Sequence, residues 1–579
     1  MKRFISRPLE FLTYHLNSWQ KLMHDHKILE AARNRTLAMG GIFLLAFMVI
    51  GVRLVDVMIF QGHSPETEST ITRVEQLLSN RADIIDRNGE ILATHLVTGS
   101  VYANPKVIIN AEEAALKIHK VIPELKYETL LKRLKSERGF IWVVRHISPK
   151  LQNEINNLGI PGVYLQRDER RVYPHGNLVS HVLGYCGIDN NGLGGVEQFF
   201  DTRLRKDAGT PLQLSIDMRV QHLVREELQD AIREFSAEGA NCIIMTAEGE
   251  ILAMVSLPDF DPNLPNQNLV NTTFNRNTLG IYECGSIFKV FNTAIALDSG
   301  RARINSIYDA TTPIKVGSKS ITDFKGKNRP LDVREVFVYS SNIGSAKMAL
   351  DFGSRLQREY FQKLGLLKTP KLELPEIGAP LLPPHHWSDV TTMTLSYGYG
   401  IAVSPLMLVD AVRAVIKGYR KYSATLLKRM DDCVLRSEGE HRIVSERTSA
   451  TIRDLMRLVV QEGTAKKANV PGYEVIGKTG TAHKSQGRRG YNVDRITSFV
   501  GAFPKDNPQY IVAVFLDSPK PTKNTHGYAT GGWNAAPTAG KIITRLASLM
   551  GVQPTENDAI NDNYGFIPIR HTVVDSHED

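Results

Sequence analysis

The chain has 579 residues, of which 42% are hydrophobic and 23% are charged, and its formal net charge is +9. This length and apolar content predict a globular chain of more than one domain with an ample core. The basic residues are dispersed, without an aromatic-basic stripe or a zinc-ligand spacing. The composition therefore argues against a nucleic-acid-binding protein and favours a membrane surface or an anionic polymer as the partner.

The first 60 residues have the pattern of a membrane anchor. Residues 1–36 carry seven Lys or Arg, and residues 37–52 are all apolar or Gly, with further apolar residues from Leu54 to Phe60 around Arg53 and Asp56. About 20 apolar residues cross a bilayer, so the stretch is long enough if Arg53 snorkels. No cleavage site follows. We predict an uncleaved transmembrane helix over residues 37–60, with a cytoplasmic tail at 1–36 and the remainder outside; the alternative is a buried soluble helix.

Residues 61–205 are predicted to form a β-rich domain without catalytic residues. Asn88-Gly89 is typical of a hairpin turn, and residues 111–135 have helical spacing that Pro123 divides into two helices. The nearby acids are better explained by turn and surface roles than by paired-carboxylate catalysis; they are Asp83, Asp86 and Glu90.

Residues 206–555 alternate strand and helix patterns. The expected helices are Val220–Phe235 and Pro537–Leu549, and the expected strands are Leu212–Ile216, Ala240–Met245, Ile251–Val255, Tyr473–Gly477, Ile496–Phe503 and Tyr510–Leu516. This order predicts an α/β (α+β) domain in which helices sandwich a five-stranded antiparallel sheet, with a helical subdomain over about residues 286–460. Residues 556–579 are acidic, lack periodicity and are predicted to be a disordered tail.

A candidate nucleophile lies near the middle of this domain. Ser286 begins an apolar run that ends at Asp298-Ser299-Gly300, which predicts a buried helix with Ser286 in its first turn. Lys289 lies three residues later and shares its helical face, so its amine could take the hydroxyl proton of Ser286. Alone, this spacing is common by chance.

Two further motifs follow in order. Ser340-Ser341-Asn342 comes after a possible short helix at 331–339, and Lys478-Thr479-Gly480-Thr481 comes after the expected strand at 473–477. Three such motifs in this order are typical of penicillin-recognising serine acyltransferases. The cysteines lie far apart with no Cys-x-x-Cys, which argues against a metal or redox motif and leaves a disulfide open; they are Cys186, Cys242, Cys284 and Cys433.

The chain beyond residue 60 resembles a class B penicillin-binding protein, a monofunctional peptidoglycan D,D-transpeptidase. Residues 81–89, 171–176, 181–184 and 192–197 are similar to the motifs of that family's pedestal domain. Residues 396–401, 463–465 and 477–482 are similar to the division-specific, septal branch. The chain departs from the pattern at Cys284, where many relatives have Pro.

The resemblance implies that Ser286 attacks the D-Ala-D-Ala carbonyl of a wall stem peptide and that an amine of a neighbouring stem then takes the acyl group. Neutral Lys289 would be the base, because burial and a second cation at Lys478 would lower its pKa. The implied relay residues are Ser340 and Asn342, the implied carboxylate-binding residues are Lys478, Thr479 and Thr481, and Gly480 would leave room for substrate. The backbone N–H groups of Ser286 and Thr481 would form the oxyanion hole, penicillin and other β-lactams would acylate Ser286, and no metal or cofactor is needed.

Several alternatives remain open. A β-lactamase would need a deacylating base, and no Glu-x-x-Leu-Asn follows Asn342. A β-lactam sensor would need more than 36 cytoplasmic residues, and a non-catalytic scaffold would have an unreactive serine. If the chain is a transpeptidase, the alternative to a septal enzyme is an elongation-specific transpeptidase. The family further implies a single-pass protein of the bacterial inner membrane with a periplasmic catalytic domain, partnered by division-complex proteins that include a polytopic glycosyltransferase.

Overall fold

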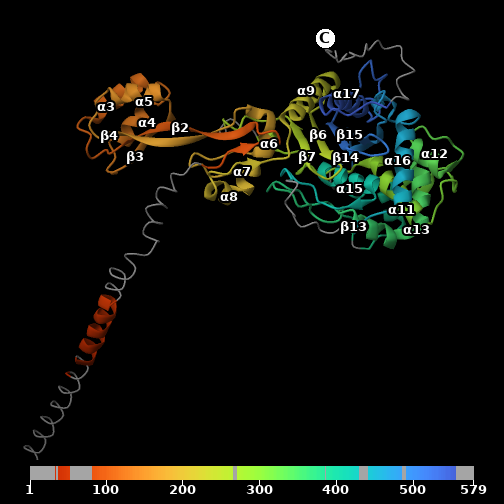
Figure 1. Cartoon of the computed structure of the whole chain (residues 1–579), viewed down its shortest axis with the longest axis horizontal. Helices are drawn as coiled ribbons and strands as arrows, with labels where there is room; N and C mark the ends of the chain where they lie inside the picture. The colour runs from red at the N-terminus through yellow and green to blue at the C-terminus, as the bar shows by residue number, and fades with distance from the viewer. Residues whose placement is uncertain are drawn as a thin grey trace, which may run out of the picture. The chain divides into compact units, whose positions relative to one another are not determined.

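The computed structural model describes residues 33, 37–52, 81–264, 270–317, 319–384, 386–429, 441–485 and 491–555, in two units, Met1–Ser79 and Asn80–Asp579 (Figure 1). In the first unit, residues 37–52 are a helix with exposed side chains. Within the described ranges, no helix combines the length and the apolar character needed to cross a membrane. The predicted anchor residues 53–60, the basic tail apart from Arg33, and the acidic tail 556–579 lie outside the described residues.

The second unit begins with a mixed sheet. Its strands are β1 (Ile84–Ile85), β2 (Ile91–Ala103), β3 (Ile141–Ile147), β4 (Val163–Val172) and β5 (Leu212–Gln213), in the order β3-β2-β1-β5 with β4 also paired to β2. The predicted turn at Asn88-Gly89 joins β1 to β2, and Gly89 has a φ of +93° that favours glycine. The carboxylate of Asp86 accepts the backbone N–H of Asn88 and of Glu90, which confirms its turn role.

The predicted strand at residues 212–216 is only partly correct. Just two of its residues form β5, and they pair in parallel with β1 rather than joining the later sheet. The next residues turn away because the backbone N–H of Ser215 donates to the carbonyl of Leu426 in another segment.

Helices α3 (Ala111–Val121), α4 (Tyr127–Leu134) and α5 (Pro149–Asn156) pack with β2, β3 and β4 around a separate small core. The predicted division of residues 111–135 near Pro123 is confirmed. Three short helices follow β4: α6 (Ser180–Leu183), α7 (Gly195–Phe199) and α8 (Asp201–Lys206).

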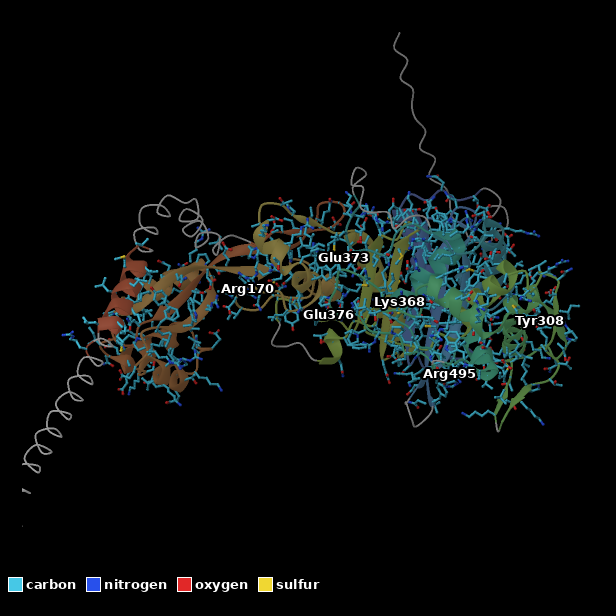
Figure 2. All side chains as sticks on the ribbon, turned by 90° about the horizontal axis from the view of Figure 1, so that it is seen from below. Arg170, Tyr308, Lys368, Glu373, Glu376 and Arg495 are labelled. Atoms are coloured by element: carbon cyan, nitrogen blue, oxygen red, sulfur yellow. The ribbon has the colours of Figure 1, made fainter. Side chains whose placement is uncertain are left out.

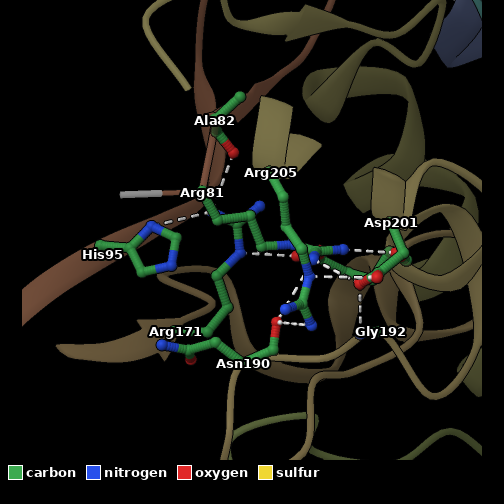
Figure 3. A network of polar contacts seen from close by, with 9 residues as sticks. Arg81, Ala82, His95, Arg171, Asn190, Gly192, Asp201 and Arg205 are labelled. Carbon is green, nitrogen blue, oxygen red and sulfur yellow. Dashed lines mark hydrogen bonds and ion pairs between the residues drawn. The ribbon is translucent and has the colours of Figure 1, made fainter. Parts of the chain in front are cut away.

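A buried ion cluster joins these segments. The fully buried carboxylate of Glu197 accepts one bond from Nε of Arg81 and one from Nε of Arg171, each of 2.6 Å. Arg81 also donates to Asp201 at 2.6 Å, so β4, α7, α8 and the entry to β1 meet at one point (Figure 3). Removing one partner of such a buried pair typically costs about 3–5 kcal/mol, because the other charge is left without compensation.

The larger sheet is fully antiparallel, as predicted. Its order is β14 (Ile476–Ser485), β15 (Tyr491–Phe503), β16 (Tyr510–Asp517), β6 (Gly239–Thr246) and β7 (Ile251–Leu257). The expected strand at residues 473–477 was placed too early. It begins at Ile476 and contains the whole Lys478–Thr481 motif, because Lys478 pairs with Val500 and Thr481 with Thr497 on β15.

Helices cover both faces of this sheet (Figure 1). Helix α9 (Met218–Phe235) packs on β6 and β7, and α17 (Ala535–Leu549) packs on β15, β16 and α9; both confirm predicted helices. Asp217 caps α9 by accepting the backbone N–H of Arg219, and its apolar positions recur with helical period. The other face carries α15 (Pro405–Lys417) and α16 (Glu446–Gln461).

The helical subdomain is built around α11 (Lys289–Asp298) and α13 (Asn342–Lys363). Helix α12 (Val333–Val338) confirms the short helix expected at 331–339, and a capping box between Asp332 and Glu335 fixes its start. The remaining small elements are α10 (Val270–Thr273), α14 (Asp389–Ser396), β8 (Ile307–Asp309), β9 (Ile314–Val316), β10 (Lys319–Ile321), β11 (Pro330–Asp332), β12 (Tyr419–Arg420) and β13 (His441–Arg442).

Two carboxylates on the segment between α13 and α14 hold distant backbone amides (Figure 2). Glu376 accepts the N–H of Gly195 at the start of α7, at 2.9 Å. Glu373 accepts both the hydroxyl of Thr425, at 2.7 Å, and the N–H of Leu426, at 2.8 Å. This segment therefore connects the part of the second unit that contains the larger sheet with the part that contains α7.

Candidate active site

Ser286 lies on a tight turn that leads into a buried helix. The turn is the 3-10 segment Gly285–Phe288, and α11 follows it directly, close to the predicted helix start. Gly285 has a φ of +54°, and a Cβ there would lie 2.7 Å from the carbonyl oxygen of Thr481. Gly398, at φ +83°, approaches from the other side, and a Cβ on it would overlap the carbonyl of Gly285. Two glycines thus allow three backbone segments to meet at Ser286.

The structure brings the predicted catalytic side chains together around one amine. Nζ of Lys289 lies 3.0 Å from Oγ of Ser286, 2.7 Å from Oδ1 of Asn342, and 2.6 Å and 3.0 Å from the carbonyl oxygen and Oγ of Ser340. Lys289 has no exposed surface. The amide of Asn342 is oriented by its Nδ2, which donates to the carbonyl of Thr322 at 2.9 Å, so its oxygen faces the lysine.

This environment suits an uncharged lysine. Burial, and next the repulsion from Lys478, hold the pKa of Lys289 well below its ordinary value of 10.5. A neutral amine has two N–H groups and one lone pair. The two N–H groups have acceptors in the carbonyl of Ser340 and Oδ1 of Asn342, so the lone pair is left to accept the proton of Ser286.

Ser340 bridges the two lysines. Its Oγ lies 3.0 Å from Nζ of Lys289 and 3.0 Å from Nζ of Lys478. Its backbone has a φ of +60°, a left-handed conformation that turns the hydroxyl out between α12 and α13. Burial lowers the pKa of Lys478 to about 7. A hydroxyl in this position can pass a proton between the two amines.

Sequence reasoning missed Asp323, which holds the second motif in place. Its Oδ1 accepts the backbone N–H of Asn342 at 2.6 Å and that of Ile343 at 2.9 Å, and its Oδ2 accepts the hydroxyl of Ser341 at 2.6 Å. The carboxylate therefore caps the start of α13, which is favourable at a helix N-terminus. No local pattern marked it, because it lies 18 residues before Ser341.

Glu283 was also missed. Its Oε1 accepts the N–H of Gly400 at 2.8 Å and the hydroxyl of Tyr491 at 3.2 Å. These bonds tie the residues just before the turn at Ser286 to Gly400 and to β15. Burial raises the pKa of the Glu283 carboxyl.

The third motif forms one wall of the site along β14. Thr479 shares a hydroxyl bond of 2.6 Å with Thr464, and Oγ1 of Thr481 accepts the N–H of Gly531 at 3.0 Å. A Cβ on Gly480 would lie 2.6 Å from the carbonyl oxygen of Cys284. Gly480 is thus required for β14 to lie against the nucleophile turn, in addition to any role with substrate. β14 is the edge strand of its sheet, so its side away from β15 has no strand partner among the described residues.

These residues open into a cleft of about 690 Å³. Its lining includes Ser286, Ser340, Asn342, Thr479 and Thr481. Arg495, on β15, lines the same cleft (Figure 2). The volume is that of a small-molecule or peptide site.

The three cysteines in the described part of the chain make no hydrogen bond with the side chains of Ser286 and Lys289. Cys186, Cys242 and Cys284 are free and buried, and Cys433 lies outside the described residues. Burial raises the pKa of the Cys284 thiol, which makes it a poor nucleophile. In the described part of the chain, no cluster of His, Cys, Asp or Glu could hold a metal ion.

Comparison with protein families gives two matches. Residues 239–544 match the penicillin binding protein transpeptidase domain, and residues 76–212 match the penicillin-binding protein dimerisation domain. The first contains every predicted site residue, and the second runs from before β1 to the first residue of β5.

Curated relatives cover nearly the whole chain. A probable peptidoglycan D,D-transpeptidase FtsI of Caulobacter vibrioides is 39% identical over 487 residues, which is 82% of each chain. The peptidoglycan D,D-transpeptidase FtsI of Escherichia coli K12 is 30% identical and covers 90% of this chain and 92% of its own. The stage V sporulation protein D of Bacillus subtilis is 30% identical, with 91% and 87% covered.

Solved structures share the fold. Penicillin binding protein 3 of Mycobacterium tuberculosis, complexed with aztreonam, superposes with a TM-score of 0.63 at 24% identity, over 82% of this chain and 97% of that one. A putative peptidoglycan glycosyltransferase of Atopobium parvulum gives a TM-score of 0.64 at 23% identity, over 82% and 99%.

Proposed function

Since the chain belongs to the class B penicillin-binding proteins, we propose that it is a septal peptidoglycan D,D-transpeptidase and that Ser286 is its acylated nucleophile. The observation that carries the proposal is the 3.0 Å approach of Nζ of Lys289 to Oγ of Ser286, at a lysine whose pKa is strongly lowered by burial. A serine hydroxyl is a weak nucleophile without such a base.

The first half-reaction is acylation. Neutral Lys289 takes the proton of Ser286 while Oγ attacks the carbonyl carbon between the two D-alanines. The carbon–nitrogen bond then breaks, and the departing D-alanine amine receives a proton from Lys289 through the hydroxyl of Ser340. General base catalysis of this kind contributes roughly 100- to 10,000-fold.

The second half-reaction repeats these steps in reverse order. The amine of a neighbouring stem peptide attacks the ester carbonyl, gives up a proton to the same relay, and forms the cross-link as Ser286 regains its hydroxyl proton. No atom changes its oxidation state in either half-reaction, and the only by-product is D-alanine.

Substrate binding is assigned to the edge of β14. The terminal carboxylate lies against the hydroxyls of Thr479 and Thr481, with Lys478 behind them as a positive charge. The peptide adds to the free edge of β14 as a further strand, a common mode of peptide binding. The backbone N–H groups of Ser286 and Thr481 receive the oxyanion, and one such donor is typically worth about 3 kcal/mol.

The direct test is covalent labelling by a fluorescent penicillin. Wild-type protein should label, Ser286→Ala should not, and Lys289→Ala should label at least about 100-fold more slowly. Each variant should still fold and show a cooperative melting transition. Mass spectrometry should find the adduct on the peptide that contains Ser286. Labelling of the Ser286→Ala protein, or an adduct on another peptide, would contradict the assignment.

We further propose that residues 37–60 form a single membrane anchor and that the catalytic domain is periplasmic. The support is the uninterrupted apolar sequence at 37–52 after a basic segment, and its helical structure. An alkaline phosphatase fusion after residue 70 should be active, and one at residue 30 should be inactive. The reverse pattern would contradict this topology.

The septal role rests on the similarity to the two relatives named FtsI. Division-complex membrane proteins, including a polytopic glycosyltransferase, are the proposed partners. Depletion of the protein should therefore give filaments, because growth continues without septa. Rounded cells would instead support an elongation-specific transpeptidase.

A further inference from the structure

The cleft has a basic lining beyond the catalytic lysines. Four lysines line it, and none makes an ion pair with a carboxylate in the described part of the chain: Lys325, Lys327, Lys466 and Lys467. The acidic side chain in the lining is Glu462. A concave surface with this excess of uncompensated positive charge attracts anions.

Aromatic rings hold three of these lysines. Nζ of Lys325 lies 4.3 Å from the ring centre of Tyr528, and Nζ of Lys467 lies 3.9 Å from that of Trp533. The two rings are stacked, at 5.9 Å and an interplanar angle of 16°. Nζ of Lys327 lies 4.5 Å from the ring of Tyr339. Cation–π contacts position an ammonium group without neutralising it, so each lysine still has N–H groups for an anion.

This row of Lys325, Tyr528, Trp533 and Lys467, called the lysine–aromatic row below, joins three loops. Lys325 follows β10, the two rings precede α17, and Lys467 lies in the 3-10 turn Lys466–Ala468. Lys466 and Lys467 come two and three residues after Thr464, whose hydroxyl is bonded to Thr479 at 2.6 Å. The row is therefore next to the hydroxyls that are assigned to the terminal carboxylate of the donor peptide.

The position of the lysine–aromatic row indicates which part of the reaction it could serve. The terminal carboxylate belongs to the D-alanine that leaves, so the carboxylate end of the cleft is where the leaving amine departs. By microscopic reversibility, the acceptor amine attacks the acyl-enzyme from the side on which the first amine left. The lysine–aromatic row is thus beside the path of the acceptor.

We propose that this row, with Lys327 and Lys466, is the acceptor subsite and that it binds carboxylates of the acceptor stem peptide; the proposal rests on the transpeptidase function above. The ammonium groups pair with carboxylates that flank the attacking amine, and the rings support the peptide backbone. A neutral acceptor gains nothing from the lysines, so the enzyme should prefer an anionic amine.

The test measures how the acyl-enzyme is partitioned. Full-length protein in detergent is acylated by a thioester donor, and chromatography gives the ratio of aminolysis to hydrolysis. The acceptors are glycyl-D-glutamate, which carries two carboxylates, and its neutral diamide. Because both compete with water for the same acyl-enzyme, the ratio is independent of the acylation rate, which penicillin labelling reports separately.

Wild-type protein should prefer the carboxylate acceptor. Exposed ion pairs are worth up to about 1 kcal/mol, so Lys325→Gln and Lys467→Gln should each reduce this preference roughly two- to fivefold, and the double variant about tenfold. Transfer to the diamide should not change. The matched control is Lys523→Gln, an exposed lysine on the same loop as Tyr528 that does not line the cleft and should keep the wild-type preference.

The proposal is overturned if the double variant keeps the wild-type preference for the carboxylate acceptor. It is also overturned if the substitutions slow acylation and leave the ratio of aminolysis to hydrolysis unchanged, because the lysines would then act on the donor peptide during acylation. A wild-type protein that is acylated but transfers to neither acceptor would contradict the subsite. A wild-type protein that is not acylated at Ser286 would instead contradict the proposed function itself.

Discussion

Replacing Lys478 by Gln should move the pH dependence of acylation to higher pH. Lys289 must be neutral to accept the proton of Ser286, and the repulsion from Lys478 is the second cause, after burial, of its lowered pKa. Without that cation the pKa of Lys289 rises. Acylation then begins only at a higher pH.

The size of the shift follows from the geometry. Both amines lie 3.0 Å from Oγ of Ser340, so they are at most about 6 Å apart. Two unit charges at about 6 Å interact by about 3 kcal/mol at an effective dielectric constant of about 20, which corresponds to roughly two pKa units. Because burial lowers the pKa of Lys478 to about 7, this amine is only partly charged at neutral pH, and the shift in the pKa of Lys289 is smaller than a fully charged cation would give.

The assay is the second-order rate constant for penicillin acylation between about pH 5 and pH 10. The maximum rate of Lys478→Gln should fall because the carboxylate contact is lost. The rising limb of the profile, which is the pH range over which the rate increases, is a separate quantity that reports the pKa of Lys289. Lys478→Arg keeps the cation and is the matched control, with the limb near its wild-type position. A limb that stays in place in Lys478→Gln would refute the electrostatic coupling of the two lysines.

Three further predictions concern the same site. At pH 7, Lys478→Met should raise the unfolding free energy by up to about 5 kcal/mol, because the buried amine of the wild-type protein has a pKa of about 7 in the folded state and 10.5 in the unfolded state. The stability of the wild-type protein falls as the pH drops from 10.5 to about 7, whereas that of the variant does not depend on this group. Calorimetry should therefore show that the gain vanishes at about pH 11. Asp323→Ala should slow penicillin acylation about tenfold or more, since Asn342 loses its support, and an unchanged rate would show that the cap is dispensable. Gly398→Ala should slow acylation without preventing folding, because the added methyl group displaces the turn at Ser286; circular dichroism checks the fold.

The contact between Ser286 and Lys289 could be predicted because it is local. Ser286 and Lys289 are three residues apart on one helical turn, and the apolar run after them required burial, which in turn lowers the pKa of the lysine. Three strands of the large sheet, β6, β7 and β16, could also be predicted, since each is a short, almost wholly apolar run.

Features that depend on contacts between distant segments were not predictable in this way. Asp323 became part of the site only when its loop folded against the start of α13. The start of β14 was misplaced because Lys478-Thr479-Gly480-Thr481 has no strand-like apolar alternation, and pairing with β15 decides its conformation. β5 joined the first sheet because two residues paired with β1, a partner more than 120 residues away.

The unpartnered edge of β14 has a consequence for drug resistance. In the proposed binding mode, a β-lactam and the natural stem peptide both present a carboxylate to Thr479 and Thr481 and a carbonyl to the same backbone N–H groups. A substitution that blocked access to the unpaired edge of β14 would exclude both the antibiotic and the substrate. Selection for resistance should therefore act at residues around the rim of the cleft, where the two molecules differ in shape, or on the mobility of the turn at Ser286, and it should leave β14 itself unchanged.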